Sequence, residues 1–291
     1  MKIVSLTVAR NEQWVVGLSL RVALRWVDEA VVLLHNCSDR TEGIVREIAK
    51  DTNRVHVLTQ TDPVWTEMAH RQRTLDAGRE IGGTHFAIVD ADEIPTGNVL
   101  GRLRGWTEGL EGGQLLDLPM IPCWKDLTAY RCDQIGMWRH SRITLAFKDM
   151  PGLCWKPKED GYQYHNRPPL GSKVDPNLRA YPLTRQEQGG IFHLEYANYR
   201  RLIAKHALYK MDEVVRWPGR EPNVAVDAKY SLAITERGLM VRPVPAEWWE
   251  GYDASQIRMV DEPWQEAEVK RLWKEHGPDK FKRMNLYGLV P

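Results

Sequence analysis

Three carboxylates follow one apolar run, in residues 86–93 (FAIVDADE). Carboxylates that crowd together repel one another unless a cation neutralises them. Sites for Mg²⁺ or Mn²⁺ that serve nucleotide substrates use one or two such carboxylates, with phosphate oxygens in the remaining positions. The segment therefore predicts a divalent-metal site at Asp90 and Asp92, and a solvated acidic turn before Pro95 is the alternative.

A histidine much later in the chain is a further candidate ligand. His193 lies in residues 190–195 (GIFHLE), a short predicted strand that leads into a basic helix. A neutral imidazole is a good ligand for Mn²⁺. His193 is therefore a candidate third ligand, and a hydrogen-bonded core histidine is the alternative.

Basic side chains on two predicted helices could face a phosphate group. Arg201 and Lys205 stand four residues apart, so they share a helix face, and cations there would stabilise a departing diphosphate. Arg71, on an earlier predicted helix, allows the same interpretation. The alternatives are a solvated basic face and, for Arg71, a surface pair with Glu67.

The elements that must position these residues alternate between strand and helix in the first hundred residues. Apolar runs predict strands at residues 2–9, 29–34, 54–58 and 85–89, and apolar stripes at helical spacing predict helices between them, the third at 65–81. This alternation indicates an α/β fold with a parallel sheet, helices on both faces and ligands at the carboxyl ends of the strands. After residue 101 the pattern loosens, with predicted strands at 114–121 and 142–147 and helices at 196–215 and 264–275.

Composition excludes several classes of protein. With 291 residues, of which 43% are hydrophobic and 27% charged, the chain is typical of globular proteins. Its formal charge of +1 predicts no global attraction to nucleic acid or to a membrane surface. No apolar run approaches the roughly 18–20 residues of a membrane span. The four cysteines form no CxxC pair, which predicts reduced, structural thiols and fits a cytoplasmic protein.

Four segments, taken in order, resemble a family-2 glycosyltransferase of the GT-A fold. They are residues 8–12 (VARNE) at the end of the first strand, residues 37–41 (CSDRT) after the second, residues 90–93 (DADE), and His193 before the basic helix. The resemblance is clear over residues 1–100, weaker to about 215 and absent beyond. It implies a glycosyltransferase domain at 1–215, with a nucleotide-binding half at 1–100 and an acceptor half at 101–215, and an extension at 216–291 packed on it.

The resemblance also implies roles for individual residues. Asp92 would be the direct metal ligand, joined by Asp90 and His193, with Mn²⁺ or Mg²⁺ as the ion. The family often has an acidic residue just past the second strand, where this chain has His35 and Asn36, so UDP follows from the family and not from these residues. The residues expected to hold the nucleotide-sugar donor are Ala9, Arg10, Asn11, Glu12, His35, Asn36, Asp39, Arg71, Asp90, Ala91, Arg201 and Lys205.

The acceptor side is expected in the later half of the chain, where most of the 12 tryptophans lie. Flat aromatic rings stack well on sugar rings or bases, although core packing is the ordinary use of tryptophan. Transfer with inversion, which the family implies, needs a carboxylate to take the proton of the acceptor hydroxyl. Asp160 is the preferred base, with Glu159 and Glu195 as alternatives, and the expected acceptor-binding residues are Trp124, Trp138, Trp155, Tyr162 and His165.

The expected function is thus a metal-dependent glycosyltransferase that moves a sugar from a nucleotide-sugar donor to a hydroxyl of a glycan, a protein or a hydroxymethylated DNA base. A nucleotidyltransferase is one alternative, but such enzymes carry a Gly-rich phosphate loop after the first strand, where this chain has Arg10, Asn11 and Glu12. A non-catalytic sugar- or nucleotide-binding protein on the same fold is the other.

Overall fold

The computed structural model describes residues 1–291 apart from residues 134–140, 159–165, 173–178 and 260–261. Its contacts divide the chain into two compact units made of interleaved segments. The sheet unit comprises Met1–Ile121, Arg142–His193 and Pro245–Arg258, and the helical unit comprises Pro122–Ser141, Leu194–Val244 and Met259–Pro291. The division of the chain at residue 215, which rests on resemblance, stays a prediction.

The sheet unit is built on an eight-stranded sheet in the order β3-β2-β1-β4-β8-β6-β9-β5. Strands β1, β2, β3 and β4 pair in parallel, whereas β8 runs antiparallel to β4 and β6, and β5 antiparallel to β9. The strands are β1 (Ile3–Ala9), β2 (Glu29–His35), β3 (Val55–Gln60), β4 (His85–Ile88), β5 (Glu93–Pro95), β6 (Leu115–Pro122), β8 (Arg142–Lys148) and β9 (Ile191–His193). The predicted α/β fold with a mostly parallel sheet is confirmed.

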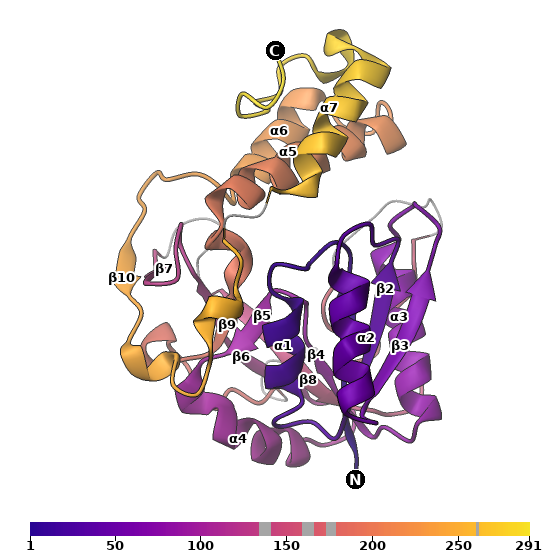
Figure 1. Ribbon diagram of the computed structural model, residues 1–291, viewed down its shortest axis with the longest axis vertical. Helices are drawn as coiled ribbons and strands as arrows, with labels where there is room; N and C mark the ends of the chain where they lie inside the picture. Colours follow the sequence, from indigo (N-terminus) through magenta and orange to yellow (C-terminus); the bar gives the residue numbers. More distant parts are fainter. Residues whose placement is uncertain (134–140, 159–165, 173–178, 260–261) are drawn as a thin grey trace. The chain divides into compact units, whose positions relative to one another are not determined.

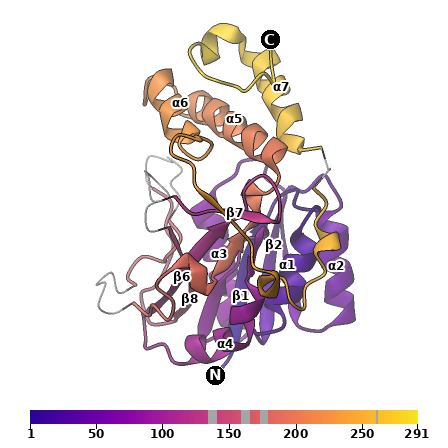
Figure 2. The same cartoon turned by 90° about the vertical axis from the view of Figure 1, so that its left-hand side faces the viewer.

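Helices cover both faces of this sheet. Successive side chains of a strand point to opposite faces, and those of β2 enter two different apolar clusters. Val31 packs in one buried cluster with Met68 of α3, whereas Val32 packs in another with Val45 of α2. The helices of the unit are α1 (Val16–Ala23), α2 (Thr41–Asp51), α3 (Glu67–Glu80) and α4 (Gly97–Glu108), with short 3₁₀ turns at Gln186–Gln188, Ala246–Trp248 and Ala254–Gln256. Helix α4 lies beside the N-terminus in both views (Figures 1 and 2).

The helical unit packs three helices around one apolar cluster (Figure 2). They are α5 (Tyr199–Arg216), α6 (Asn223–Ser231) and α7 (Trp264–His276), preceded by the 3₁₀ turn η4 (Leu194–Tyr196) and followed by η7 (Pro278–Phe281). A small antiparallel pair, β7 (Ala129–Arg131) with β10 (Val241–Pro243), belongs to the same unit. Within the described ranges, no helix combines the length and the apolar character that a bilayer span requires.

The basic residues of helix α5 do not all lie on a solvated face. Arg201 is only 6% exposed and Lys210 is completely buried. The Lys210 ammonium donates to Asp227, to Ser231, to the Asn285 carbonyl and to the Tyr287 hydroxyl, at 2.7–2.9 Å. Arg201 and Lys210 are therefore both buried, and Lys210 joins α5 to α6 and to residues 285–287.

Candidate metal and donor site

The carboxyl ends of three neighbouring parallel strands carry most of the predicted donor residues. Strands β2, β1 and β4 are adjacent in the sheet and run in the same direction, so the loops that follow them leave from one edge. In open α/β sheets this edge is where ligands bind. The segments that follow are residues 10–15, 36–40 and 89–92, as the sequence predicts.

Asp92 and His193 meet where β5 pairs with β9. Asp92 immediately precedes β5, and the antiparallel register places Glu93 opposite His193. The His193 Nε2 atom is 3.9 Å from the Asp92 Oδ2 atom, and their side chains are 18% and 11% exposed. Two side chains far apart in the sequence are thus brought face to face by a three-residue strand pair.

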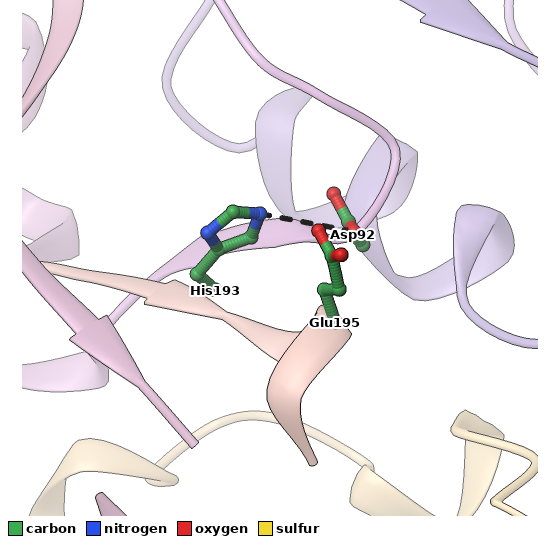
Figure 3. A group of neighbouring side chains, drawn as sticks. All are labelled: Asp92, His193 and Glu195. Carbon is green, nitrogen blue, oxygen red and sulfur yellow. Dashed lines mark ion pairs between the residues drawn. The ribbon is translucent and has the colours of Figure 1, made fainter. Parts of the chain in front are cut away.

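Glu195 follows His193 by two residues, in the 3₁₀ turn η4 that continues directly from β9. One candidate ligand atom from each of Asp92, His193 and Glu195 lies within 4.8 Å of the others (Figure 3). One imidazole nitrogen and two carboxylate oxygens suit Mn²⁺, and carboxylates also suit Mg²⁺. This donor set fits a divalent cation.

Glu195 also lies beside a lysine and a histidine of the helical unit. The Lys205 ammonium donates to one carboxylate oxygen at 2.9 Å, and the His206 Nε2 atom lies 3.6 Å from the other. The predicted diphosphate partner Lys205 is therefore engaged with Glu195. Arg201, its predicted companion, is buried, and its backbone N–H is capped by the Asn198 side chain.

Asp90 lies in a different network from Asp92. Its carboxylate accepts from Arg71 at 3.1 and 3.2 Å and from Arg167 at 3.0 Å. Arg71 also donates to Glu67 at 2.9 Å, so the pair that the sequence offered as an alternative to phosphate binding is present, but it is buried. Although burial opposes the guanidinium charge, Asp90 and Glu67 raise the pKa of Arg71.

Glu93 is the third carboxylate of the strand end and is only 2% exposed. Burial raises the pKa of its carboxyl group, an effect that the neighbouring Arg167 charge opposes. Neither Glu93 nor Arg167 was expected at the site. The acidic run contains Glu93 as a visible signal, whereas Arg167 stands in a loop without periodicity or motif.

The loops after β1 and β2 are held to each other by side chains predicted to bind the donor. The Asn11 Oδ1 atom accepts from the Ser38 backbone N–H at 2.8 Å. Asp39 accepts from the backbone N–H groups of Thr41 at 2.9 Å and Gln13 at 3.1 Å. Asn11 has a φ of 55°, in the left-handed region that asparagine tolerates better than most residues. Asn11 and Asp39 thus fix the loop after β1 against the loop after β2.

His35 lies at the end of β2 in an aromatic cluster that the sequence did not indicate. Its ring has no exposed surface and lies 5.1 Å from the Trp65 ring and 4.6 Å from the His70 ring, measured between centroids. Burial lowers the pKa of His70 to about 4 and also lowers the pKa of His35. The cluster is therefore a neutral group of packed rings at the carboxyl end of β2.

Acidification is expected to destabilise the protein as the pH falls from about 6.5 to about 4 through His70. In this window the unfolded chain binds a proton at this residue and the folded chain does not, so the free energy of unfolding decreases toward low pH. The loss is at most about 3 kcal/mol. Urea unfolding at several pH values should show a smaller pH dependence in His70→Gln than in the wild type. Equal dependence in both proteins would contradict the prediction.

The predicted acceptor residues that the structure describes are buried. Trp155 is 2% exposed in the core of the sheet unit, where it packs against Phe147. Trp124 is 4% exposed in the helical unit, with the Arg131 guanidinium 4.7 Å from its ring centre. Both rings are covered by protein atoms. Trp138, Glu159, Asp160, Tyr162 and His165 lie outside the described residues.

Comparisons with known proteins give structural similarity only. No family model matches the chain, and no curated protein matches it. Similar solved structures include the glucosyl-3-phosphoglycerate synthase of Mycobacterium tuberculosis in complex with Mn²⁺, UDP and phosphoglyceric acid, residues 1–349 of S. aureus TarS, and a 4-diphosphocytidyl-2C-methyl-D-erythritol synthase.

These similarities are distant. The glucosyl-3-phosphoglycerate synthase is 24% identical with a TM-score of 0.32, and the match covers 42% of this chain and 43% of that one. TarS is 12% identical with a TM-score of 0.40, over 95% of this chain and 82% of that one. The erythritol synthase is 18% identical with a TM-score of 0.35, over 50% and 75%. The chain thus spans less than half of the first of these proteins. The α/β fold of the chain is established by the strand order and helix positions described above.

Proposed function

We propose that this protein is a metal-dependent glycosyltransferase that moves a sugar from a UDP-sugar to an acceptor hydroxyl, with inversion. The observation that carries the proposal is the cluster of Asp92, His193 and Glu195 beside the carboxyl ends of the parallel strands. The choice of UDP follows the resemblance to family-2 glycosyltransferases.

In this proposal, Asp92, His193 and Glu195 hold Mn²⁺ or Mg²⁺. A bound divalent ion of this kind neutralises the donor diphosphate and stabilises the charge that develops as it leaves. The loops after β1 and β2, held together through Asn11 and Asp39, form the floor for the nucleoside. Asp90 is restrained by two arginines at the end of β4.

The acceptor hydroxyl loses its proton to a carboxylate as it attacks the sugar. Because Glu195 lies with the two other ligand residues, we assign it to the metal. Asp160 is the proposed base, with Glu159 as the alternative. The acceptor is a glycan, a protein or a modified nucleic acid.

The loop after β1 favours this proposal over nucleotidyl transfer, since residues 10–13 (RNEQ) contain no glycine with which to surround a triphosphate. The same metal cluster would serve either reaction, so a test must separate them by product. Release of nucleoside diphosphate marks sugar transfer, whereas pyrophosphate release marks nucleotidyl transfer.

A panel of nucleotide sugars, each with Mn²⁺, Mg²⁺ or EDTA, tests the proposal directly. We expect one UDP-sugar to be hydrolysed slowly in the presence of Mn²⁺, to be turned over faster with a suitable acceptor, and to be stable in EDTA. Free nucleoside diphosphate is the readout. If no donor is turned over and none raises the melting temperature, the proposal is wrong; stabilisation without turnover in any acceptor screen would point to a non-catalytic binding protein.

A further inference from the structure

Arg167 is bound on every side at the acidic strand end. Its Nε donates to the Thr144 carbonyl, its Nη1 to Asp90 and Glu93, and its Nη2 to Glu93 and the Ile88 carbonyl, at 2.6–3.0 Å. Its side chain is 11% exposed. A guanidinium has five N–H donors in a rigid fork, and these bonds engage all three nitrogens.

These bonds tie Arg167 to two chain segments beside the proposed metal ligands, namely residues 88–93 and strand β8. Ile88 is the last residue of β4, Asp90 lies in the turn, Glu93 begins β5, and Thr144 lies on β8. Glu93 is the register partner of His193 and directly follows Asp92. Arg167 therefore restrains the turn that contains Asp92 from both of its ends.

The three carboxylates of this turn point toward two different sets of partners. Asp90 and Glu93 turn toward arginines, with Arg167 contacting both and Arg71 contacting Asp90. Asp92 turns toward His193 and Glu195 instead (Figure 3). Without a cation behind the turn, three neighbouring carboxylates would repel one another and compete for one metal ion.

We infer that Arg167 is a positioning residue of the metal site: it holds Asp90 and Glu93 away from the ion and keeps Asp92 directed at His193. This inference rests on the proposed function, because it assumes that the Asp92 cluster binds a divalent cation. Partners that orient metal ligands contribute about 10- to 100-fold in metal affinity. Changing Arg167 is therefore expected to weaken Mn²⁺ binding by a factor of that size.

The test measures Mn²⁺ binding without any donor, by titration calorimetry or from the signal of free Mn²⁺ in electron paramagnetic resonance. Arg167→Gln is expected to weaken Mn²⁺ binding by about 10-fold or more. Arg167→Lys should fall between this variant and the wild type, because one ammonium replaces the charge but not the fork. Urea unfolding in EDTA measures the stability of each variant separately.

Arg79 supplies the matched control. It makes a similar fork to Asp149, with both bonds at 2.8 Å, and also donates to the Leu153 carbonyl at 2.8 Å. Asp149 directly follows β8. It therefore lies near the start of β4, whereas the acidic turn lies beyond the end of β4. Arg79→Gln should lower stability and leave Mn²⁺ affinity unchanged. If Arg167→Gln does not fold, the double variant Arg167→Gln/Glu93→Gln is measured instead. The second substitution removes the buried Glu93 charge, which Arg167 no longer balances.

The possible outcomes distinguish failure of the Arg167 inference from failure of the proposed function. If the wild type binds Mn²⁺ and turns over a donor while the Arg167 variants bind Mn²⁺ as tightly as Arg79→Gln does, the inference alone is wrong. If the wild type neither binds Mn²⁺ nor turns over any donor, the proposed function fails and the inference falls with it.

Discussion

Asp92→Asn is expected to lose Mn²⁺ binding and to reduce sugar transfer on the order of 1,000-fold. Asn keeps the size of the side chain but removes the negative charge that attracts the ion. A bound metal contributes several kcal/mol to stabilising the transition state, and each 1.36 kcal/mol corresponds to a factor of ten in rate. Mn²⁺ titration and initial rates with the donor found in the panel measure the two effects.

Stability should change little in this variant, since the ion-pair contact of Asp92 is a long one of 3.9 Å to His193. His193→Gln should reproduce the loss of Mn²⁺ affinity. Asp76→Asn is a suitable control, because Asp76 lies on α3 with a side chain that is 54% exposed. Unchanged Mn²⁺ affinity in Asp92→Asn, with wild-type rates, would remove the metal site from the proposal.

Lys210→Met is expected to lower the free energy of unfolding by about 3–5 kcal/mol, because breaking a buried charged pair leaves the partner uncompensated. Lys210 is completely buried and joins α5 to α6 through Asp227 and to the tail through Asn285 and Tyr287. Methionine fills a similar volume but cannot donate to any of these oxygens. Urea unfolding, followed by circular dichroism, measures the change.

Lys125→Met is the matched control in the same unit. Lys125 pairs with Glu236, and both side chains are nearly half exposed, at 44% and 45%. Exposed pairs contribute about 0–1 kcal/mol, so this variant should stay close to the wild type. Equal effects of the two substitutions would show that the buried lysine is not the link between helices and tail.

The strand and helix elements around the site were predictable from local patterns. Apolar runs with polar ends predicted β1, β2 and β4, and the acidic run at 90–93 was expected at a strand's carboxyl end. His193 was singled out as a ligand from its place before a basic helix, and it lies 3.9 Å from Asp92. Such patterns are readable because the period of a strand or helix depends only on near neighbours in the chain.

The tertiary structure alone decided which of these side chains meet. The register of β5 with β9 brings Asp92 to His193, and the fold carries Arg167 to the turn from a loop without any pattern. It also buries Trp155, expected as an acceptor surface, and Arg201, expected on a basic helix face. Register and burial depend on contacts between residues distant in sequence, and no local spacing records them. The sequence by itself therefore indicated Asp92 and His193 as candidate ligands and placed the acidic run at a strand end, while the packing of distant segments determined which side chains lie beside them.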